Sequence, residues 1–173
     1  MSTRQATAAA IAALAVASGA FLAWGRPEAI DAPRLASIHL PRLLPQPYRA
    51  DADATMEIEQ AFQRAMVSGR RVIVDLGANW CPDCRALAGM FQIREFQRLL
   101  AERYEHVYVD VNRFERNMHV VRALGITDLN GIPTVLIFSP ERRLLNRATS
   151  EEWHDAATRN AQQAFNYFWR WSR

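Results

Sequence analysis

Apolar and polar residues alternate along the chain in a way that predicts helices and strands from about residue 54 onward. Apolar residues recur at helical spacing over 54–67, and Ser68 and Gly69 end that pattern. A short apolar run over 71–76 then predicts a buried strand. The helix face expected to pack inward consists of Met56, Ile58, Ala61, Phe62, Ala65 and Met66.

The same patterns predict the remaining elements. Further helices are expected over 81–91, 95–104, 113–124 and 151–169, and further strands over 107–111, 134–138 and 144–147. The last two strands flank a short turn, which favours an antiparallel hairpin. Several residues of the final helix share one side, where helical aromatic spacing typically means core contact: Trp153, Ala157, Ala161, Ala164, Phe165 and Phe168.

The first 25 residues have a different character. Arg4 precedes an alanine-dominated, uncharged run over 6–24, which is the layout of an export signal. Small residues at 15–17 and at 18–20 would both serve as cleavage sites. The run is also just long enough to span a bilayer, so a retained membrane anchor is one alternative, and an alanine-rich soluble helix is another. A signal or an anchor would place the rest of the chain outside the cytoplasm, where disulfides persist.

Residues 26–50 are predicted to form a proline-rich linker or arm. This segment holds five of the eight prolines, which favours an extended backbone. Its apolar residues are more numerous than a free spacer needs, so we expect part of the arm to lie against the domain formed by residues 51–173. These apolar residues are Ile38, Leu40, Leu43 and Leu44.

Composition and charge narrow the class of protein. The chain has 173 residues, of which 50% are apolar, and this is enough for one sizeable core. All 21 cationic residues are arginine, and they are interspersed with carboxylates, so nothing indicates nucleic-acid binding. The only two cysteines lie close together, which leaves no disulfide framework to support the fold.

Those cysteines carry the candidate chemistry. Cys81 and Cys84 follow the strand predicted over 71–76, and a Cys-x-x-Cys pair at the end of a strand is typical of a redox motif. Their spacing places the thiols one helical turn apart. Cys81 is expected at the helix N-terminus, where the helix dipole favours a thiolate, so it is the predicted nucleophile.

A metal site is the alternative interpretation of the cysteine pair. Structural zinc takes four ligands, and the chain offers no second cysteine pair. The four histidines also lack zinc-finger spacing, so we expect no metal. They are His39, His106, His119 and His154.

Two stretches resemble the thioredoxin superfamily. Residues 74–85, with the core Trp80-Cys81-Pro82-Asp83-Cys84, are similar to its active-site segment, and 131–134 followed by an apolar run resembles its cis-proline loop. The resemblance covers roughly residues 53–169. It implies an α/β, thioredoxin-like fold with a central mixed β-sheet flanked by helices.

The resemblance also implies roles for individual residues. Cys81 would attack a substrate disulfide, and Cys84 would resolve the mixed disulfide. Asp75 corresponds to a buried carboxylate that moves a proton to or from the second thiol, and burial would raise its pKa toward neutrality. The alternative for Asp75 is a strand-end residue that caps a loop.

The candidate substrate contacts come from the same resemblance. Pro133 corresponds to the cis-proline that faces the cysteines, which leaves the backbone of Ile132 free to pair with substrate. An ordinary trans-proline is the alternative. Trp80 is expected to shield the thiol on one side, or simply to pack as an aromatic residue.

Three residues depart from the family pattern. His106 lies where thioredoxins commonly carry a lysine near the buried carboxylate, which would introduce a titrating imidazole. Asp83 places a carboxylate between the cysteines, which should disfavour the thiolate and favour a reducing potential. Gly77 replaces an aromatic residue found in many thioredoxins, so we expect the surface beside it to be less covered.

Taken together, the sequence predicts an exported or membrane-tethered thiol–disulfide oxidoreductase that uses the Cys81/Cys84 couple and no cofactor. Its substrates would be disulfides of exported proteins, and reduction is favoured over oxidation. An exported reductase is cut off from cytoplasmic reductants, so a membrane electron donor is implied. The alternative, from a different class, is a thioredoxin-fold module that binds a protein or a metal ion without redox turnover.

Overall fold

The computed structural model describes residues 31–36 and 43–173, so the predicted signal or anchor over 1–25 lies outside the described part. The helices are α1 (Ala54–Ser68), α2 (Pro82–Met90), α3 (Arg94–Arg103), α4 (Met118–Ala123) and α5 (Ala161–Trp171). The strands are β1 (Arg71–Gly77), β2 (Tyr104–Asp110) and β3 (Thr134–Phe138), and two 3₁₀ turns follow, η1 (Arg147–Thr149) and η2 (Ala156–Thr158). None of the described helices has both the length and the apolar character needed to cross a bilayer.

The three strands form the predicted mixed sheet. Their order is β2-β1-β3, with β1 parallel to β2 and antiparallel to β3. The central strand is buried from Val72 to Gly77. In the register of the sheet, Asp75 lies opposite Tyr108 on β2 and Val135 on β3.

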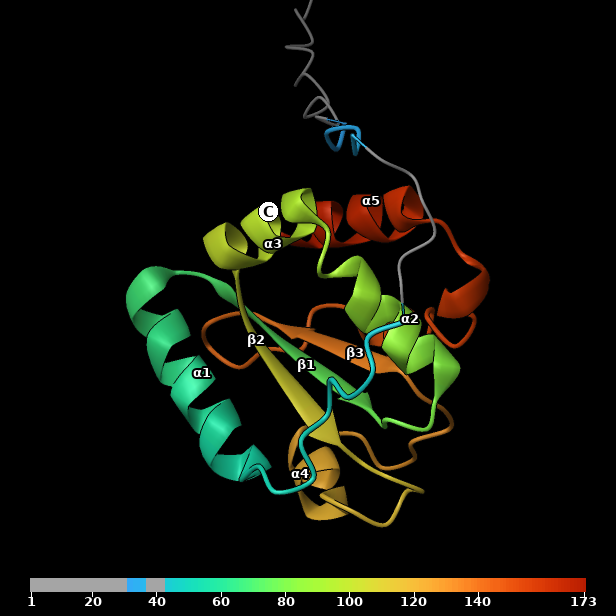
Figure 1. Cartoon of the computed structure of the whole chain (residues 1–173). Helices are drawn as coiled ribbons and strands as arrows, with labels where there is room; N and C mark the ends of the chain where they lie inside the picture. Colours follow the sequence, from blue (N-terminus) through green and yellow to red (C-terminus); the bar gives the residue numbers. More distant parts are fainter. Residues whose placement is uncertain (1–30, 37–42) are drawn as a thin grey trace, which may run out of the picture. The chain divides into compact units, whose positions relative to one another are not determined.

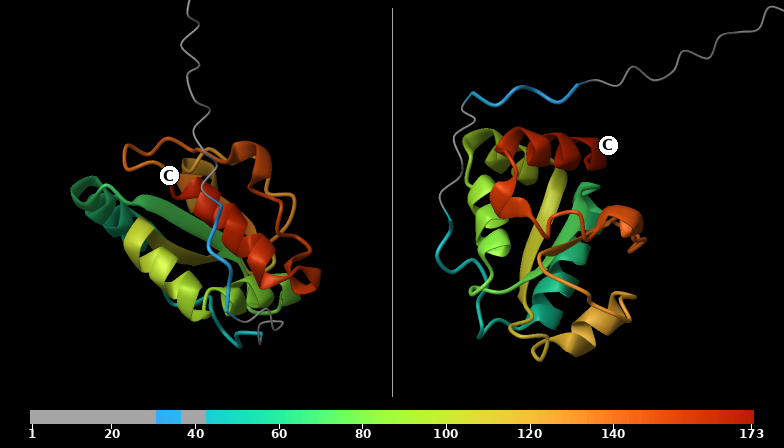
Figure 2. Two further views of the ribbon diagram at one scale, coloured as in Figure 1. Left: turned by 90° about the horizontal axis from the view of Figure 1, so that it is seen from above. Right: turned by 90° about the vertical axis from the view of Figure 1, so that its right-hand side faces the viewer.

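Helices cover both faces of this sheet (Figure 1). Side chains of β1 alternate between the faces, so Val72, Val74 and Leu76 pack in the cluster that includes α1 and α4. Ile73 instead packs with α2, α3 and α5. Asp75 has the same parity as Ile73 and therefore points to the face that α2 covers. The arm over residues 43–50 runs along the side of the sheet where α2 lies (Figures 1 and 2).

Helix α1 ends one residue later than predicted and has a narrower buried face. The side chain of Asp53 caps its start by accepting from the N–H of Met56 at 2.9 Å, and Gly69 ends it in the left-handed conformation at φ 72°. The predicted inward position of two methionines is wrong, since Met56 is 52% and Met66 63% exposed. At about 100° per residue, Met56 lies opposite the buried stripe and Met66 at its edge.

The predicted hairpin after β3 is largely absent. Only an isolated bridge joins Phe138 to Leu144, and no strand forms over 144–147. Instead, the buried side chain of Asn146 accepts from the N–H of Ile137 at 2.8 Å and donates to the carbonyl of Val135 at 2.7 Å. Two backbone hydrogen bonds flank the bridge, from the N–H of Leu145 to Ile137 at 2.8 Å and from the N–H of Ser139 to Arg143 at 2.9 Å, and the amide of Asn146 supplies the pairing beyond them.

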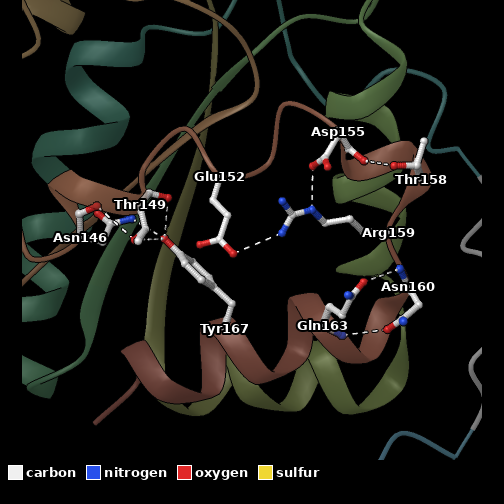
Figure 3. A network of polar contacts seen from close by, with 9 residues as sticks. All are labelled: Asn146, Thr149, Glu152, Asp155, Thr158, Arg159, Asn160, Gln163 and Tyr167. Carbon is white, nitrogen blue, oxygen red and sulfur yellow. Dashed lines mark hydrogen bonds and ion pairs between the residues drawn. The ribbon is translucent and has the colours of Figure 1, made fainter.

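The helix predicted over 151–169 begins ten residues later, at Ala161. Asn160 and Gln163 form a capping box that fixes this start. Ahead of it, Arg159 contacts Asp155 at 2.6 Å and Glu152 at 3.2 Å, which holds the preceding turns (Figure 3). The expected core contacts are nevertheless present for most of the set, because Trp153, Ala161, Ala164, Phe165 and Phe168 are buried, whereas Ala157 is exposed.

The helix predicted over 113–124 is also shorter and starts at Met118. The backbone has positive φ at Asn112, Phe114 and Asn117, which is incompatible with a helix. Asp110 organises this loop, because it accepts from the N–H of Asn112 at 2.9 Å and pairs with Arg116.

Candidate active site

Cys81 and Cys84 meet at the start of α2, where they form a disulfide with their Cα atoms 5.3 Å apart. Cys81 is the N-cap residue of this helix, and its Sγ accepts from the N–H of Cys84 at 3.1 Å. Pro82 fits the first helical position because its missing N–H would have no partner there. The helix N-terminus therefore directs positive partial charge at the sulfur of Cys81.

The two sulfur-bearing residues differ in access. Cys84 is fully buried at 0% exposure, whereas Cys81 retains 3%. An incoming thiolate or disulfide therefore meets Cys81 first. The role of Cys81 as the nucleophile stays a prediction.

The loop before β3 faces the disulfide. The Ile132–Pro133 peptide bond is cis, and the carbonyl oxygen of Ile132 lies 3.6 Å from the Sγ of Cys81. Among the described residues, the N–H of Ile132 has no hydrogen-bond partner. The structure thus brings Cys81, Ile132 and Pro133 together, with an unused backbone donor beside the sulfur.

Trp80 lies at the rim of the site. Its side chain is 46% exposed, and its indole N–H donates to the carbonyl of Asn112 at 3.1 Å. The guanidinium of Arg113 lies 5.3 Å from the ring centroid. The loop after β2 therefore fixes the indole next to Cys81, while much of the ring remains open to a substrate.

Asp75 is a buried carboxyl group with a neutral partner. It is 0% exposed, and its Oδ1 accepts from the hydroxyl of Tyr48 at 3.0 Å. Its Oδ2 has no hydrogen-bond partner in the described structure. Burial raises the pKa of Asp75 to about 7, against the opposing effect of the Tyr48 hydrogen bond. This carboxyl group caps no loop, and it is suited to gain or lose a proton near neutral pH.

Tyr48 is the functional residue that the sequence analysis missed. It is 1% exposed, its ring packs edge-on against Tyr108 at 5.3 Å, and burial raises the pKa of its hydroxyl well above the usual value. Its backbone N–H donates to Oδ1 of Asn79 at 3.0 Å, and its carbonyl accepts from Nδ2 of Asn79 at 2.7 Å. This amide clamp ties the backbone of Tyr48 to Asn79, which lies two residues before Cys81.

Gly77 makes room for Tyr48. A Cβ at position 77 would lie 2.3 Å from both Cζ and the hydroxyl oxygen of Tyr48, which is far inside contact distance. The expectation of a less covered surface beside Gly77 is therefore wrong. The arm supplies the aromatic ring from elsewhere in the chain.

The arm is also bonded on the other side of the cysteine pair. The N–H of Leu44 donates to the carbonyl of Arg85 at 3.1 Å, and Nε of Arg85 donates to the carbonyl of Leu44 at 3.1 Å. Farther along, the N–H of Leu35 donates to Gln162 at 2.7 Å. Part of the proline-rich segment thus lies against the domain as expected, but it is held by hydrogen bonds: Leu43 is 40% exposed, and Ile38 and Leu40 lie outside the described residues.

His106 does not supply the titrating imidazole that was expected near the carboxylate. His106 lies within β2 and pairs with Ile73, two positions away from the register partner of Asp75, which is Tyr108. Burial lowers the pKa of His106 to about 4, so the imidazole stays neutral at physiological pH.

Asp83 has a structural contact in addition to its position between the cysteines. Its Oδ1 accepts from the N–H of Ala157 at 2.8 Å, which ties η2 to the first turn of α2. Within residues 31–36 and 43–173, neither Asp83 nor Asp75 takes part in an ion pair. The same part of the chain contains no group of three or more His, Cys, Asp and Glu side chains placed to hold a metal ion.

Comparisons with known proteins agree with this geometry. A family model described as thioredoxin-like matches residues 53–140, about half of the chain. Among solved structures, 17 chains match, including the crystal structure of a disulphide isomerase from Xylella fastidiosa Temecula1. That similarity has 27% identity and a TM-score of 0.70, and covers 74% of this chain and 98% of the other. No curated protein matches the sequence.

Proposed function

Because the chain belongs to the thioredoxin-like family and is a thiol–disulfide oxidoreductase, we propose that it reduces disulfides in exported proteins. The observation that carries the proposed direction is the pair of carboxyl groups around the cysteines, Asp75 and Asp83. Neither is neutralised by a cation among the residues that the structure describes.

In the first step, the Cys81 thiolate attacks one sulfur of a substrate disulfide. The substrate S–S bond breaks, a bond forms between Cys81 and that sulfur, and the other substrate sulfur leaves as a thiolate that takes up a proton. The unpartnered N–H and the carbonyl of Ile132 would pair with the substrate main chain at this stage. Trp80 would cover one side of the mixed disulfide.

In the second step, Cys84 loses its proton and attacks the Sγ of Cys81. The Cys81–Cys84 disulfide forms, and the remaining substrate sulfur leaves as a thiolate that is then protonated. Two electrons have then passed from the dithiol to the substrate. Asp75 is the proposed acceptor of the Cys84 proton, since a carboxyl group with a pKa of about 7 exchanges protons readily at neutral pH.

The proposed direction of electron transfer, from the cysteine pair to the substrate, follows from electrostatics. A negative charge near the cysteines destabilises a thiolate, and so disfavours the reduced form relative to the disulfide. A couple with a disfavoured reduced form passes its electrons on readily. The N-terminus of α2 acts in the opposite sense, because its partial positive charge stabilises the thiolate of Cys81.

A redox titration of the Cys81/Cys84 couple in thiol–disulfide buffers, read by alkylation and mass spectrometry, tests this direction. We expect a reversible potential near or below about −230 mV, while a value near about −120 mV would identify an oxidant. Asp83→Asn is the matched variant, because it removes the charge but keeps the acceptor for Ala157. Its potential should be less negative by about 10–20 mV, as expected for a partly exposed charge.

Disulfide isomerisation is a second candidate, favoured by the similarity to the Xylella fastidiosa disulphide isomerase. An isomerase needs only the Cys81 attack, because thiols of the substrate can complete the rearrangement, whereas a reductase also needs Cys84. The variant Cys84→Ser separates the two activities. Rearrangement of a mispaired substrate by this variant would support isomerisation, and its loss would support reduction.

If the pair does not cycle at all, the chain is better described as a binding module. The test is then whether a protein partner still binds when both Cys81 and Cys84 are replaced by Ser. Binding that survives this change, together with the absence of a reversible couple, would contradict the proposed reductase.

We also propose that the domain acts outside the cytoplasm and receives electrons from a dithiol of a membrane-bound carrier. The support is the signal-like or anchor-like composition of residues 1–25. Alkylation of Cys81 in intact cells by a membrane-impermeant reagent tests the location, and the mass of the purified chain distinguishes cleavage from anchoring. Labelling only after cell lysis would contradict export.

A further inference from the structure

We propose that Tyr48, which the proline-rich arm supplies, is a positioning residue that fixes the Asp75 carboxyl group for proton exchange with Cys84. The inference rests on the thiol–disulfide exchange proposed above. Tyr48 would not touch the reacting sulfurs. It would act through Asp75, whose protonation state and orientation it sets.

The hydrogen bond between the two residues is buried and specific. The hydroxyl of Tyr48 donates to Oδ1 of Asp75 at 3.0 Å, and both side chains are almost completely excluded from water. The second oxygen, Oδ2, has no partner in the described part of the chain. One carboxyl oxygen is thus held, and the other is left available for a proton.

The position of Tyr48 is fixed by contacts on three sides. Asn79 clamps its backbone through two hydrogen bonds, Gly77 leaves space for its ring, and Tyr108 packs against that ring. Tyr48 also belongs to the buried cluster that contains Cys81 and Cys84. The hydroxyl is therefore already oriented toward Asp75 before the reaction, so no conformational entropy is lost in placing it there.

None of the other groups that face Asp75 donates a hydrogen bond to it in the described structure. From β2, burial keeps Tyr108 protonated and His106 neutral, because it raises the pKa of the first and lowers that of the second to about 4. Asp110, also on β2, is paired with Arg116. The register partner of Asp75 on β3, Val135, is apolar, and Cys84 of α2 lies in the same buried cluster as Tyr48. Among all described residues, Tyr48 is the one hydrogen-bond donor to Asp75.

The direction of the effect follows from the chemistry of the bond. A hydroxyl that donates to a carboxylate stabilises the ionised form, so Tyr48 lowers the pKa of Asp75 against the larger effect of burial. Without the hydroxyl, Asp75 would ionise only at higher pH. Resolution of the mixed disulfide, which uses the ionised carboxylate, would then need more alkaline conditions.

The variant Tyr48→Phe in the full chain tests this inference, because it removes the hydroxyl and keeps the ring. Reduced protein is mixed with oxidised glutathione across a pH series, and the glutathione adduct on Cys81 is followed by acid quenching and mass spectrometry. We expect the acidic limb of the resolution rate to move up by about one pH unit or more. The rate at high pH should remain within about twofold.

Two controls separate positioning from a general loss of structure. Tyr108→Phe removes a hydroxyl from the same ring pair but no hydrogen bond to Asp75, so its profile should not move. In the background of Asp75→Asn, adding Tyr48→Phe should have no further effect on the profile. An unchanged profile in Tyr48→Phe, or an equal shift in Tyr108→Phe, would overturn the inference.

A second measurement does not depend on activity. The carboxyl carbon of Asp75 is titrated by NMR in the oxidised chain, where its pKa should rise in Tyr48→Phe and stay constant in Tyr108→Phe. If Tyr48→Phe fails to fold, Asn79→Ala releases the backbone clamp and should produce a smaller shift of the same sign. A wild-type chain that forms no resolvable adduct would contradict the proposed reductase, while this titration would still decide the role of Tyr48.

Discussion

At the scale of single residues, the site depends on one carboxyl group kept out of water. Asp75 lies on the central strand with a tyrosine hydroxyl as its partner instead of a cation. A buried, unpaired charge is costly, so the group keeps its proton to a higher pH than it does in the unfolded chain. The proton exchange proposed for the site and the stability of the domain therefore both depend on the titration of the Asp75 carboxyl group.

Asp75→Asn should stabilise the domain at neutral pH and above. Burial raises the pKa of Asp75 from 3.8 to about 7 in the folded chain, so between these values the unfolded chain binds fewer protons, and the stability of the wild type falls as pH rises. The asparagine does not titrate. The free energy of unfolding of the variant, relative to that of the wild type, should increase from pH 4 to pH 8 by an amount on the order of 4 kcal/mol.

Urea unfolding of both proteins across this pH range provides the measurement. Below about pH 3 both side chains are almost entirely uncharged in both states, so the difference between the two proteins should become constant there. A difference that does not change between pH 4 and pH 8 would show that the folded state does not hold the proton of Asp75.

Sequence reasoning identified the residues whose signal is local and missed those whose role depends on distant contacts. Cys81 and Pro133 lie in short motifs, and the structure places them face to face. Tyr48 meets Asp75 across 27 residues, from a segment whose prolines indicated a linker. His106 lies two positions from Tyr108 on the same strand, and the burial that keeps it neutral depends on the packing of other elements.

At the scale of elements, the helices and strands with continuous apolar patterns were predicted well. β3 has the predicted bounds, and α1 and β1 each end one residue later than predicted. β2 begins three residues earlier than predicted. The largest errors lie where asparagine determines the backbone. Asn117 adopts positive φ and delays α4, and Asn160 caps α5 in the middle of a pattern that otherwise suited a helix. Asparagine readily adopts positive φ and readily caps a helix. The spacing of apolar residues predicts neither of these.

Asn146→Ala should destabilise the fold without changing the redox potential. The substitution leaves the N–H of Ile137 and the carbonyl of Val135 without the amide that pairs with them in the interior. Unsatisfied buried polar groups cost about 1–3 kcal/mol each, so we expect a loss of about 3 kcal/mol in the free energy of unfolding. Denaturant unfolding and the redox titration check the two parts of this prediction.

Thr149→Val is the matched control for Asn146→Ala. It removes a hydroxyl that lies 3.1 Å from the hydroxyl of Tyr167 and leaves the pairing with β3 intact. Its cost should stay below about 1.5 kcal/mol. A loss as large as that of Asn146→Ala would mean that the side-chain network, and not the pairing with β3, supports this edge of the sheet.

At the scale of the whole molecule, the catalytic unit extends beyond the segment that the family match covers. That match begins at residue 53, whereas the residues from Leu44 to Tyr48 are bonded on both sides of the cysteine pair. The compact unit of the chain runs from Asp31 to Arg173. The boundary predicted at residue 51 remains a prediction for the domain, but the site itself draws on residues that precede it.

A fragment that begins at Asp51 should therefore be less stable than one that begins at Asp31. It lacks the ring of Tyr48, which is fully enclosed, and removal of a buried aromatic side chain typically costs about 3–5 kcal/mol. Thermal and urea unfolding of the two fragments measure the difference. The variant Tyr48→Ala in the longer fragment should reproduce most of this loss, and equal stability of the two fragments would contradict the prediction.

The fit between Gly77 and Tyr48 has a consequence for the evolution of this group of proteins. Compared position by position, glycine at 77 looks like the loss of an aromatic residue, although the ring is present and arrives from 29 positions earlier in the chain. The two positions should therefore vary together among homologues, since paired changes mark spatial contact. Lineages with a bulky side chain at 77 should lack the tyrosine at 48, and lineages that keep the arm should retain the glycine.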